Sequence, residues 1–92
     1  MKDGSLEDLP NIGHNLVRKL EDVGILKSED LLQKGSRAAF MLIRSSDPGA
    51  CIDMLYALEG AVRGIRWHGL GDEDKQSLRQ FYQSIEKSDP DE

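Results

Sequence analysis

The sequence predicts an all-α fold, a compact bundle of five to six short helices. Three observations predict it. Aliphatic residues recur at the three- and four-residue spacings of amphipathic helices, glycines and prolines interrupt them at short intervals, and no alternation of apolar and polar residues indicates a strand. A chain of 92 residues is the size of one domain with one core. We therefore expect a single domain over residues 1–92, with an ordered core over about residues 5–87.

Three short helices are expected in the first part of the chain. A brief helix capped by Ser5 is cut off by Pro10. After a tight turn over residues 10–13, apolar residues recur at helical spacing until Gly24, which indicates a second helix. A third helix is expected over residues 28–35, because carboxylates in its first turn suit the positive end of the helix dipole and a glycine follows.

Three further helices complete the prediction. The fourth starts near Ser36 and is broken at residues 45–49. The fifth, over about residues 50–64, is apolar around so much of its circumference that we expect it to be the central, enclosed helix. Residues 67–71 form a turn, and Asp72 is expected to cap the final helix. The apolar stripe of that helix consists of Leu78, Phe81, Tyr82 and Ile85.

The charge distribution limits the classes of partner. The formal net charge is −5, which argues against a nucleic-acid binder, whose affinity depends on Lys and Arg neutralising phosphates. Residues 71–92 contain seven acidic and three basic side chains, so the acidity is concentrated at the C-terminal end. A local basic patch is compatible with this distribution, although no block of like charges indicates one.

The cysteine content and the apolar runs predict a cytoplasmic protein. A single cysteine excludes an internal disulfide, and no charged and then apolar signal segment precedes the first acidic residues. The longest uninterrupted apolar run, residues 38–43, is far shorter than the roughly 20 residues that span a bilayer. We therefore expect no membrane insertion.

A helix-hairpin-helix spacing over residues 6–20 is the most informative local pattern. In that motif a short turn reverses the chain, and free amide groups at the start of the second helix can face a phosphate. Asn11 replaces the first glycine of the usual motif and Asn15 stands where a basic side chain would help, which weakens a DNA interpretation. The alternative is a turn that only joins two packed helices, with Ile12 in the core. The candidate phosphate or nucleic-acid contacts are Ile12, Gly13, His14, Asn15, Arg18 and Lys19.

A second candidate surface follows the expected central helix. Arg63 and Arg66 are three residues apart, which predicts that they share one helical face near its C-terminus. Together with the next two residues they form the candidate partner surface, Arg63, Arg66, Trp67 and His68. The alternative is structural, because arginines stabilise a helix C-terminus and a tryptophan in this place can fold back onto the core.

No constellation for catalysis or metal binding is recognisable. His14 and His68 are the only histidines, and neither has a Cys, His or carboxylate at the spacing of a metal site. Cys51 opens an apolar helix without an identifiable base, so we expect it to be a small packed hydrophobic residue. The chain has no glycine-rich phosphate loop and no Ser-His-Asp order. We expect a non-enzymatic protein without a cofactor.

Three stretches together resemble the C-terminal domain of the TfoX/Sxy competence-regulator family. They are residues 8–13 (DLPNIG), residues 21–25 (EDVGI) and, above all, residues 47–68 (DPGACIDMLYALEGAVRGIRWH). The resemblance covers about residues 5–84. It implies a small bacterial helical domain with a helix-hairpin-helix-like entry, usually found behind a separate N-terminal domain. Full-length relatives are linked to the control of natural competence genes with the cyclic-AMP receptor protein.

Two functional hypotheses follow from the residues and the resemblance. The leading one is an interaction module of transcriptional or competence (DNA transformation) regulation. Its expected partner is another protein, either a transcription-regulator complex or a separate N-terminal TfoX-like domain. The alternative is direct nucleic-acid binding through the helix-hairpin-helix-like motif.

Overall fold

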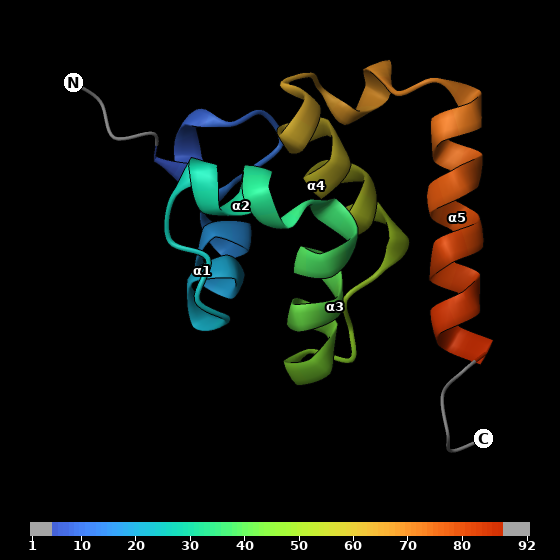
Figure 1. Cartoon of the computed structure of the whole chain (residues 1–92), viewed down its shortest axis with the longest axis horizontal. Coiled ribbons are helices and arrows are strands. Elements are labelled where there is room, and N and C mark those ends of the chain that lie inside the picture. The colour runs from blue at the N-terminus through green and yellow to red at the C-terminus, as the bar shows by residue number, and fades with distance from the viewer. Residues whose placement is uncertain (1–4, 88–92) are drawn as a thin grey trace.

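The computed structural model describes residues 5–87 and shows an all-α domain (Figure 1). Within these residues there are five α-helices, two short 3-10 turns and no strand, apart from one isolated backbone bridge between Ser5 and Lys27. The all-α prediction is confirmed. None of the described helices is long and apolar enough to cross a membrane. The elements are η1 (Leu6–Asp8), α1 (His14–Asp22), α2 (Ser28–Lys34), α3 (Ser36–Ser46), α4 (Ile52–Arg63), η2 (Trp67–Gly69) and α5 (Asp72–Lys87).

Helix α4 lies in the middle of the domain. It contacts α3, α5 and η2, while α1 and α2 lie on the far side of α3 (Figure 1). Its mostly apolar sequence is explained by this position, because side chains on several of its faces are enclosed by neighbours. The large fully buried side chains of the core are Leu6, Leu20, Ile25, Leu31, Phe40, Ile43, Leu55, Leu58 and Leu78.

The helix ends follow local chemistry. The Ser5 hydroxyl accepts the Glu7 backbone N–H at 3.3 Å and so caps η1, as expected. At the start of α2, the Asp30 carboxylate accepts two backbone N–H groups, those of Leu26 and Lys27, both at 3.1 Å. Helix α4 ends at Gly64, whose φ of 77° is a left-handed conformation that glycine adopts without steric cost.

Two expectations at helix starts are wrong. Asp72 is the first residue of α5 and not its cap, and the Gly71 carbonyl accepts the first intrahelical bond, from the Lys75 N–H at 3.0 Å. A carboxylate is favourable both at the cap and at the first helical position, so the residue type does not show which of the two Asp72 occupies. Cys51 is exposed and not packed, because α4 begins one residue later and Cys51 is its cap, with an extended backbone. The helical apolar pattern therefore does not apply to Cys51.

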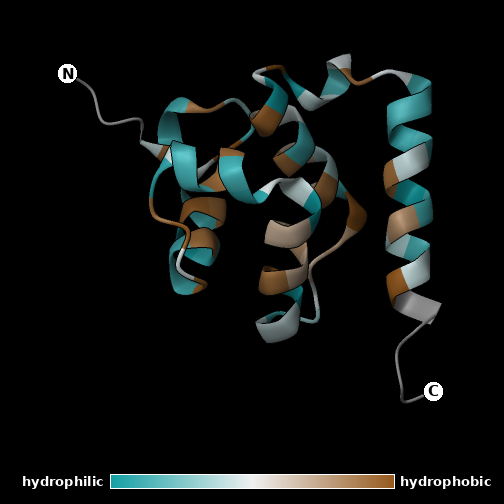
Figure 2. Cartoon of the chain, in the orientation of Figure 1, coloured by the Kyte–Doolittle hydropathy of each residue, from teal (hydrophilic) through white to brown (hydrophobic). Residues whose placement is uncertain are grey.

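Helix α5 covers the core incompletely. Leu78 is buried, but the other members of its apolar stripe, Phe81, Tyr82 and Ile85, are only half-buried. Figure 2 shows the apolar positions of α5 on the side that faces α3 and α4. The stripe thus points inward as predicted, and yet part of it stays accessible to solvent.

Candidate functional site

The turn over residues 10–13 is fastened to the end of α4 by one side chain. Asn11 has a φ of 69°, a left-handed conformation that asparagine tolerates better than most residues. Its amide nitrogen donates to the Ile65 carbonyl at 2.9 Å and to the Ala57 carbonyl at 3.4 Å. Its amide oxygen accepts the Trp67 backbone N–H at 3.1 Å. We call this segment the Asn11 turn.

A glycine on α4 makes room for the Asn11 turn. A Cβ atom placed on Gly60 would lie 2.5 Å from the Asn11 amide nitrogen and 2.7 Å from the Ile65 carbonyl oxygen. Both distances are shorter than real Cβ contacts allow, so the backbone of α4 must lack a side chain here. In the sequence, Asn11 stands out only as a departure from a DNA motif. An asparagine directly after proline is a signal for a left-handed turn residue, but it does not reveal these distant partners.

The N-terminal end of α1 is exposed beside a carboxylate. Ile12 is buried and 7% exposed, and Gly13 caps α1 without a side chain. The side chain of His14 is 94% exposed, with its Nδ1 atom 3.6 Å from Glu7. Asn15 is exposed as well. No side chain caps the first amides of α1, but the Glu7 carboxylate lies next to this helix start, which opposes the binding of an anion.

The two basic residues of α1 differ in their surroundings. Arg18 is exposed and makes no ion pair within the described part of the chain. The Lys19 ammonium group lies 2.6 Å from the Asp47 carboxylate and connects α1 to the loop after α3. Hydrogen bonds from Lys19 and from the Gly49 backbone N–H hold the pKa of Asp47 below its usual value. Lys19 is thus already neutralised by a neighbour.

Arg63 connects α4 to the start of α5. Its guanidinium group donates to Glu59 at 2.6 Å and to both carboxylate oxygens of Asp74 at 3.1 Å. Burial by itself raises the pKa of Glu59, but hydrogen bonds from Ser36 and Arg63 and the charges of Arg63 and Arg37 outweigh it and lower that pKa. The hydrogen bond with Glu59 raises the pKa of Arg63. Arg63 is therefore a structural link rather than a free cation.

The expected shared face of Arg63 and Arg66 is wrong. The left-handed Gly64 ends α4, so Arg66 lies outside the helix, with an extended backbone (φ −70°, ψ 145°) and an exposed side chain. A spacing of three residues brings side chains together only while the helix continues. Gly64 had been included in the expected helix, although a glycine at this point is also a common helix terminator.

Trp67 is half-buried at the beginning of η2. Its ring stacks on Tyr56 at a centroid distance of 5.9 Å and on His68 at 4.2 Å. The Lys75 ammonium group lies 5.4 Å from the centroid of the same ring. His68 is exposed, whereas Tyr56 is buried. Trp67 therefore packs partly on the core, and its ring contacts His68 and Lys75 at the surface.

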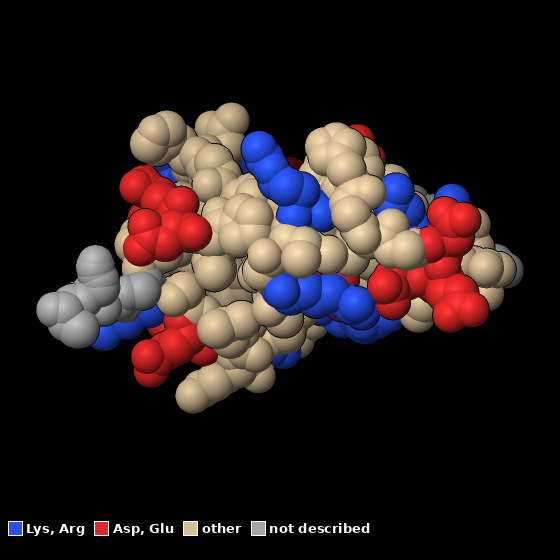
Figure 3. Space-filling view, turned by 90° about the horizontal axis from the view of Figure 1, so that it is seen from above, with Lys and Arg blue, Asp and Glu red and all other residues tan. Residues whose placement is uncertain are grey.

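The two candidate regions predicted from sequence meet in the structure. The bonds of Asn11 to Ile65 and Trp67 join residues 54 and 56 positions apart. Figure 3 shows this end of the molecule from above, with basic side chains toward the middle and acidic side chains toward both sides. The Asn11 turn and η2 thus form one continuous region. Of the basic candidates outside it, Lys19 and Arg63 are paired with carboxylates.

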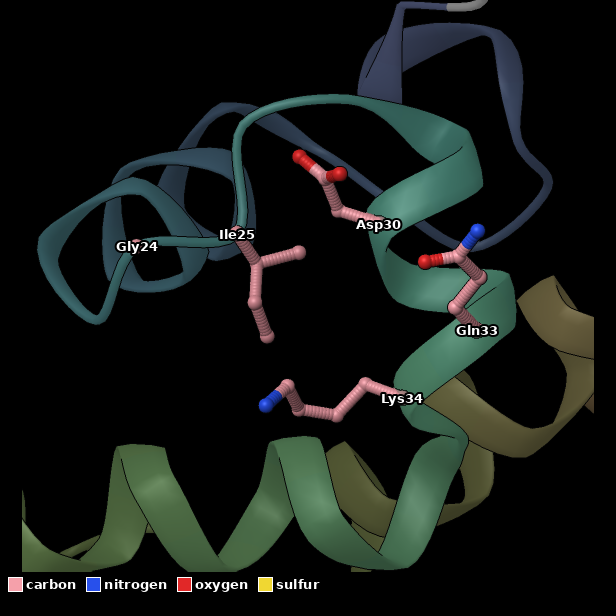
Figure 4. A pocket seen from close by; sticks show the side chains of 5 residues that line it. All are labelled: Gly24, Ile25, Asp30, Gln33 and Lys34. Carbon is pink, nitrogen blue, oxygen red and sulfur yellow. The ribbon is translucent and has the colours of Figure 1, made fainter.

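A surface pocket of about 340 Å³ lies elsewhere, between α2 and the chain after α1 (Figure 4). It includes none of the candidate site residues predicted from the sequence. The carboxylate of Asp30 in its wall already accepts two backbone N–H groups. Within the part of the chain that the structure describes, no group of three or more His, Cys, Asp or Glu side chains is placed to hold a metal ion. The lining residues are Gly24, Ile25, Asp30, Gln33 and Lys34.

The fold and these surfaces define a small all-α domain built around one enclosed helix and fastened by the Asn11 turn. The TfoX C-terminal domain family matches residues 2–82. The chain belongs to this family, which implies a regulatory domain related to competence and DNA uptake. The family resemblance seen in the sequence is thereby confirmed.

Two solved structures are similar over nearly their whole length. The first is an uncharacterized protein from Listeria monocytogenes in a triclinic crystal form, with 47% identity and a TM-score of 0.88, covering 90% of this chain and 94% of that chain. The second is a protein of unknown function from Listeria monocytogenes in a tetragonal form, with 47% identity and a TM-score of 0.86, covering 88% of this chain and 99% of that chain. No protein of curated function matches the chain.

Proposed function

We propose that this domain acts without catalysis, as a protein-interaction module in the transcriptional regulation of competence. One observation carries the proposal, namely the apolar surface that α5 leaves open. Phe81 and Ile85 on α5 are only half-buried. Met41 on α3 is 45% exposed. Contiguous apolar surface on a small domain is typical of a contact with another protein.

The charges also favour a protein partner over nucleic acid. Binding to a duplex depends on several Lys and Arg side chains that replace counterions at the phosphates. Of the basic candidates, Lys19 is paired with Asp47, and Arg63 is paired with Glu59 and Asp74. The formal net charge of −5 adds a general repulsion. The partner we propose is a transcription-regulator complex or a separately encoded N-terminal TfoX-like domain.

Direct nucleic-acid binding is the second candidate function, because of the exposed start of α1. His14 and Asn15 are exposed at a helix N-terminus that no side chain caps, and phosphates bind well at such a terminus. Arg18 is an exposed cation on the same helix. Glu7 lies 3.6 Å from His14 and weighs against this candidate.

Crosslinking in the cells that encode the protein tests the proposal. The full chain carries an affinity tag, is crosslinked in living cells, and is purified under denaturing conditions before mass spectrometry. We expect one protein to be enriched over a tagged control domain, with no change after nuclease treatment. Recovery that disappears after nuclease treatment would favour the nucleic-acid candidate. Enrichment of no protein at all would count against an interaction module.

A further inference from the structure

We infer that the face between α3 and α5 binds an amphipathic helix of a partner protein, whose apolar stripe is flanked by carboxylates. This inference rests on the proposed function, and it names the surface and the chemistry of the partner. We call this surface the α3–α5 face. It consists of Arg37, Met41 and Arg44 on α3 and of Phe81 and Ile85 on α5.

Two arginines of α3 define the polar part of the face. Arg37 and Arg44 are seven residues apart, which places them on one side of the helix two turns apart. The guanidinium of Arg37 lies 5.6 Å from the Phe81 ring centroid and donates to the Ser77 hydroxyl at 3.0 Å. The guanidinium of the half-buried Arg44 lies 5.4 Å from the Tyr82 ring centroid and donates one N–H to the Ala50 carbonyl at 3.2 Å, which leaves its other N–H groups for a partner. This side of α3 therefore points toward α5.

The apolar part of the face lies beside these arginines. Met41 is four residues after Arg37 and three before Arg44, so its side chain emerges between theirs. Its exposed fraction of 45% shows that α5 does not cover it. Phe81 and Ile85 are one turn apart on α5 and are half-buried. Met41, Phe81 and Ile85 are thus the apolar side chains of this face that solvent can reach.

The arginines of this face lack carboxylate partners, unlike Lys19 and Arg63. Within the described residues neither Arg37 nor Arg44 makes an ion pair, and α3 contains no acidic residue. The oxygens of Glu59, whose pKa is lowered in part by the charge of Arg37, accept hydrogen bonds from Ser36 and Arg63. A guanidinium stacked on a ring keeps N–H groups at its edge for a carboxylate. The face is therefore complementary to negative charge.

An acidic helix fits this surface better than a nucleic acid does. A duplex presents one phosphate charge per about 1.7 Å of its axis, and the two arginines could neutralise only two of these charges. Met41 and Ile85 offer aliphatic and thioether surface, which suits the apolar stripe of a helix. Arg37 and Arg44 are about 10 Å apart along α3, so carboxylates about seven residues apart on the partner helix would meet both.

A display library of designed helices tests the inference. Its members of about 18 residues share one apolar stripe and have randomised flanking positions. The full chain is the target, and three variants are compared: Met41→Lys, the double variant Arg37→Gln with Arg44→Gln, and the control Arg79→Gln. Arg79 is exposed and is two residues from Phe81 on α5, so it points away from the α3–α5 face. Thermal unfolding of each variant verifies that the fold is retained.

We expect the selected helices to carry Asp or Glu beside the stripe. Their affinity should fall at least about tenfold with Met41→Lys and with the double variant, and should be unchanged with Arg79→Gln. Selection of basic flanks, or of no helix that prefers the unmodified chain to Met41→Lys, would overturn the inference. Displacement of the helices by a short DNA duplex, or a dimer of the chain that Met41→Lys dissociates, would also overturn it by identifying another occupant.

Crosslinking in cells separates this inference from the proposed function. If the Met41→Lys chain still captures the protein that the unmodified chain captures, the domain is an interaction module but the α3–α5 face is not its contact. If neither chain captures a protein, the proposed function itself fails. Loss of capture with Met41→Lys alone, together with retained capture by Arg79→Gln, supports both.

Discussion

The side-chain amide of Asn11 lies against the backbone of Gly60, in the space that a side chain at position 60 of α4 would occupy. The contact joins two parts of the sequence that share no local pattern. From it the amide reaches the Ile65 carbonyl and the Trp67 N–H, so it fixes how the chain leaves α4. The stability of the whole Asn11 turn should therefore depend on these two residues.

Gly60→Ala should destabilise the domain. The new methyl group would lie 2.7 Å from the Ile65 carbonyl oxygen, which belongs to the backbone and cannot rotate away. Overpacking of this kind costs about 1–3 kcal/mol, and only part of that is offset by the better helix propensity of alanine. Urea unfolding gives the free energy directly. Gly69→Ala is the matched control, because beyond the adjacent residues the nearest atom to its new Cβ is the Ile65 Cδ1 at 3.8 Å, an ordinary van der Waals contact. Equal stability of both variants would contradict the close contact.

Replacement of Asn11 should separate its backbone role from its hydrogen bonds. Asn11→Gly keeps the left-handed conformation but removes the bonds to Ile65 and Trp67, at a cost of about 1–2 kcal/mol. Asn11→Ala should cost about 1 kcal/mol more, because an alanine at a φ of 69° is strained. Thermal unfolding of the three proteins checks the order. Equal stability of Asn11→Gly and Asn11→Ala would show that residue 11 does not keep its left-handed conformation in solution.

The ion pair of Glu59 should make stability depend on pH in the acid range. The pKa of Glu59 in the folded protein lies below its ordinary 4.5, so the stabilisation is fully present above that pH and is lost as the pH falls through the folded value. Glu59→Gln should flatten the fall of the unfolding free energy between about pH 5 and pH 3. Ser36→Ala, which removes one hydrogen bond to Glu59, should flatten it less. An unchanged slope in Glu59→Gln would contradict this assignment.

Binding to duplex DNA should be weak. Fluorescence anisotropy of a labelled duplex should show little binding at low salt and none at about 0.2 M, because Lys19 and Arg63 are already paired with carboxylates. Arg18→Glu should leave that result unchanged. Tight binding that collapses with salt and disappears in Arg18→Glu would instead establish the start of α1 as a phosphate site.

Helix positions were predictable because their causes are local. The spacing of apolar residues and the positions of Pro10, Gly35 and Pro48 gave the elements of the fold, and Ser5 was recognised as a cap from its type alone. The errors fell at boundaries. Cys51 is the cap before α4 and Asp72 is the first residue of α5, so each prediction was wrong by one position, which residue types do not resolve.

The candidate site was harder to predict, because it is built from residues that are far apart in the sequence and close in space. Local patterns identified the stretch around Gly13 and the stretch around Trp67, but not that Asn11 joins them. They also did not reveal that Lys19 meets Asp47, 28 positions away. The sequence by itself determined an all-α domain of this family and the inward stripe of α5. Tertiary structure decided which cations are neutralised and which apolar side chains stay open, because both depend on contacts between helices that no local spacing encodes.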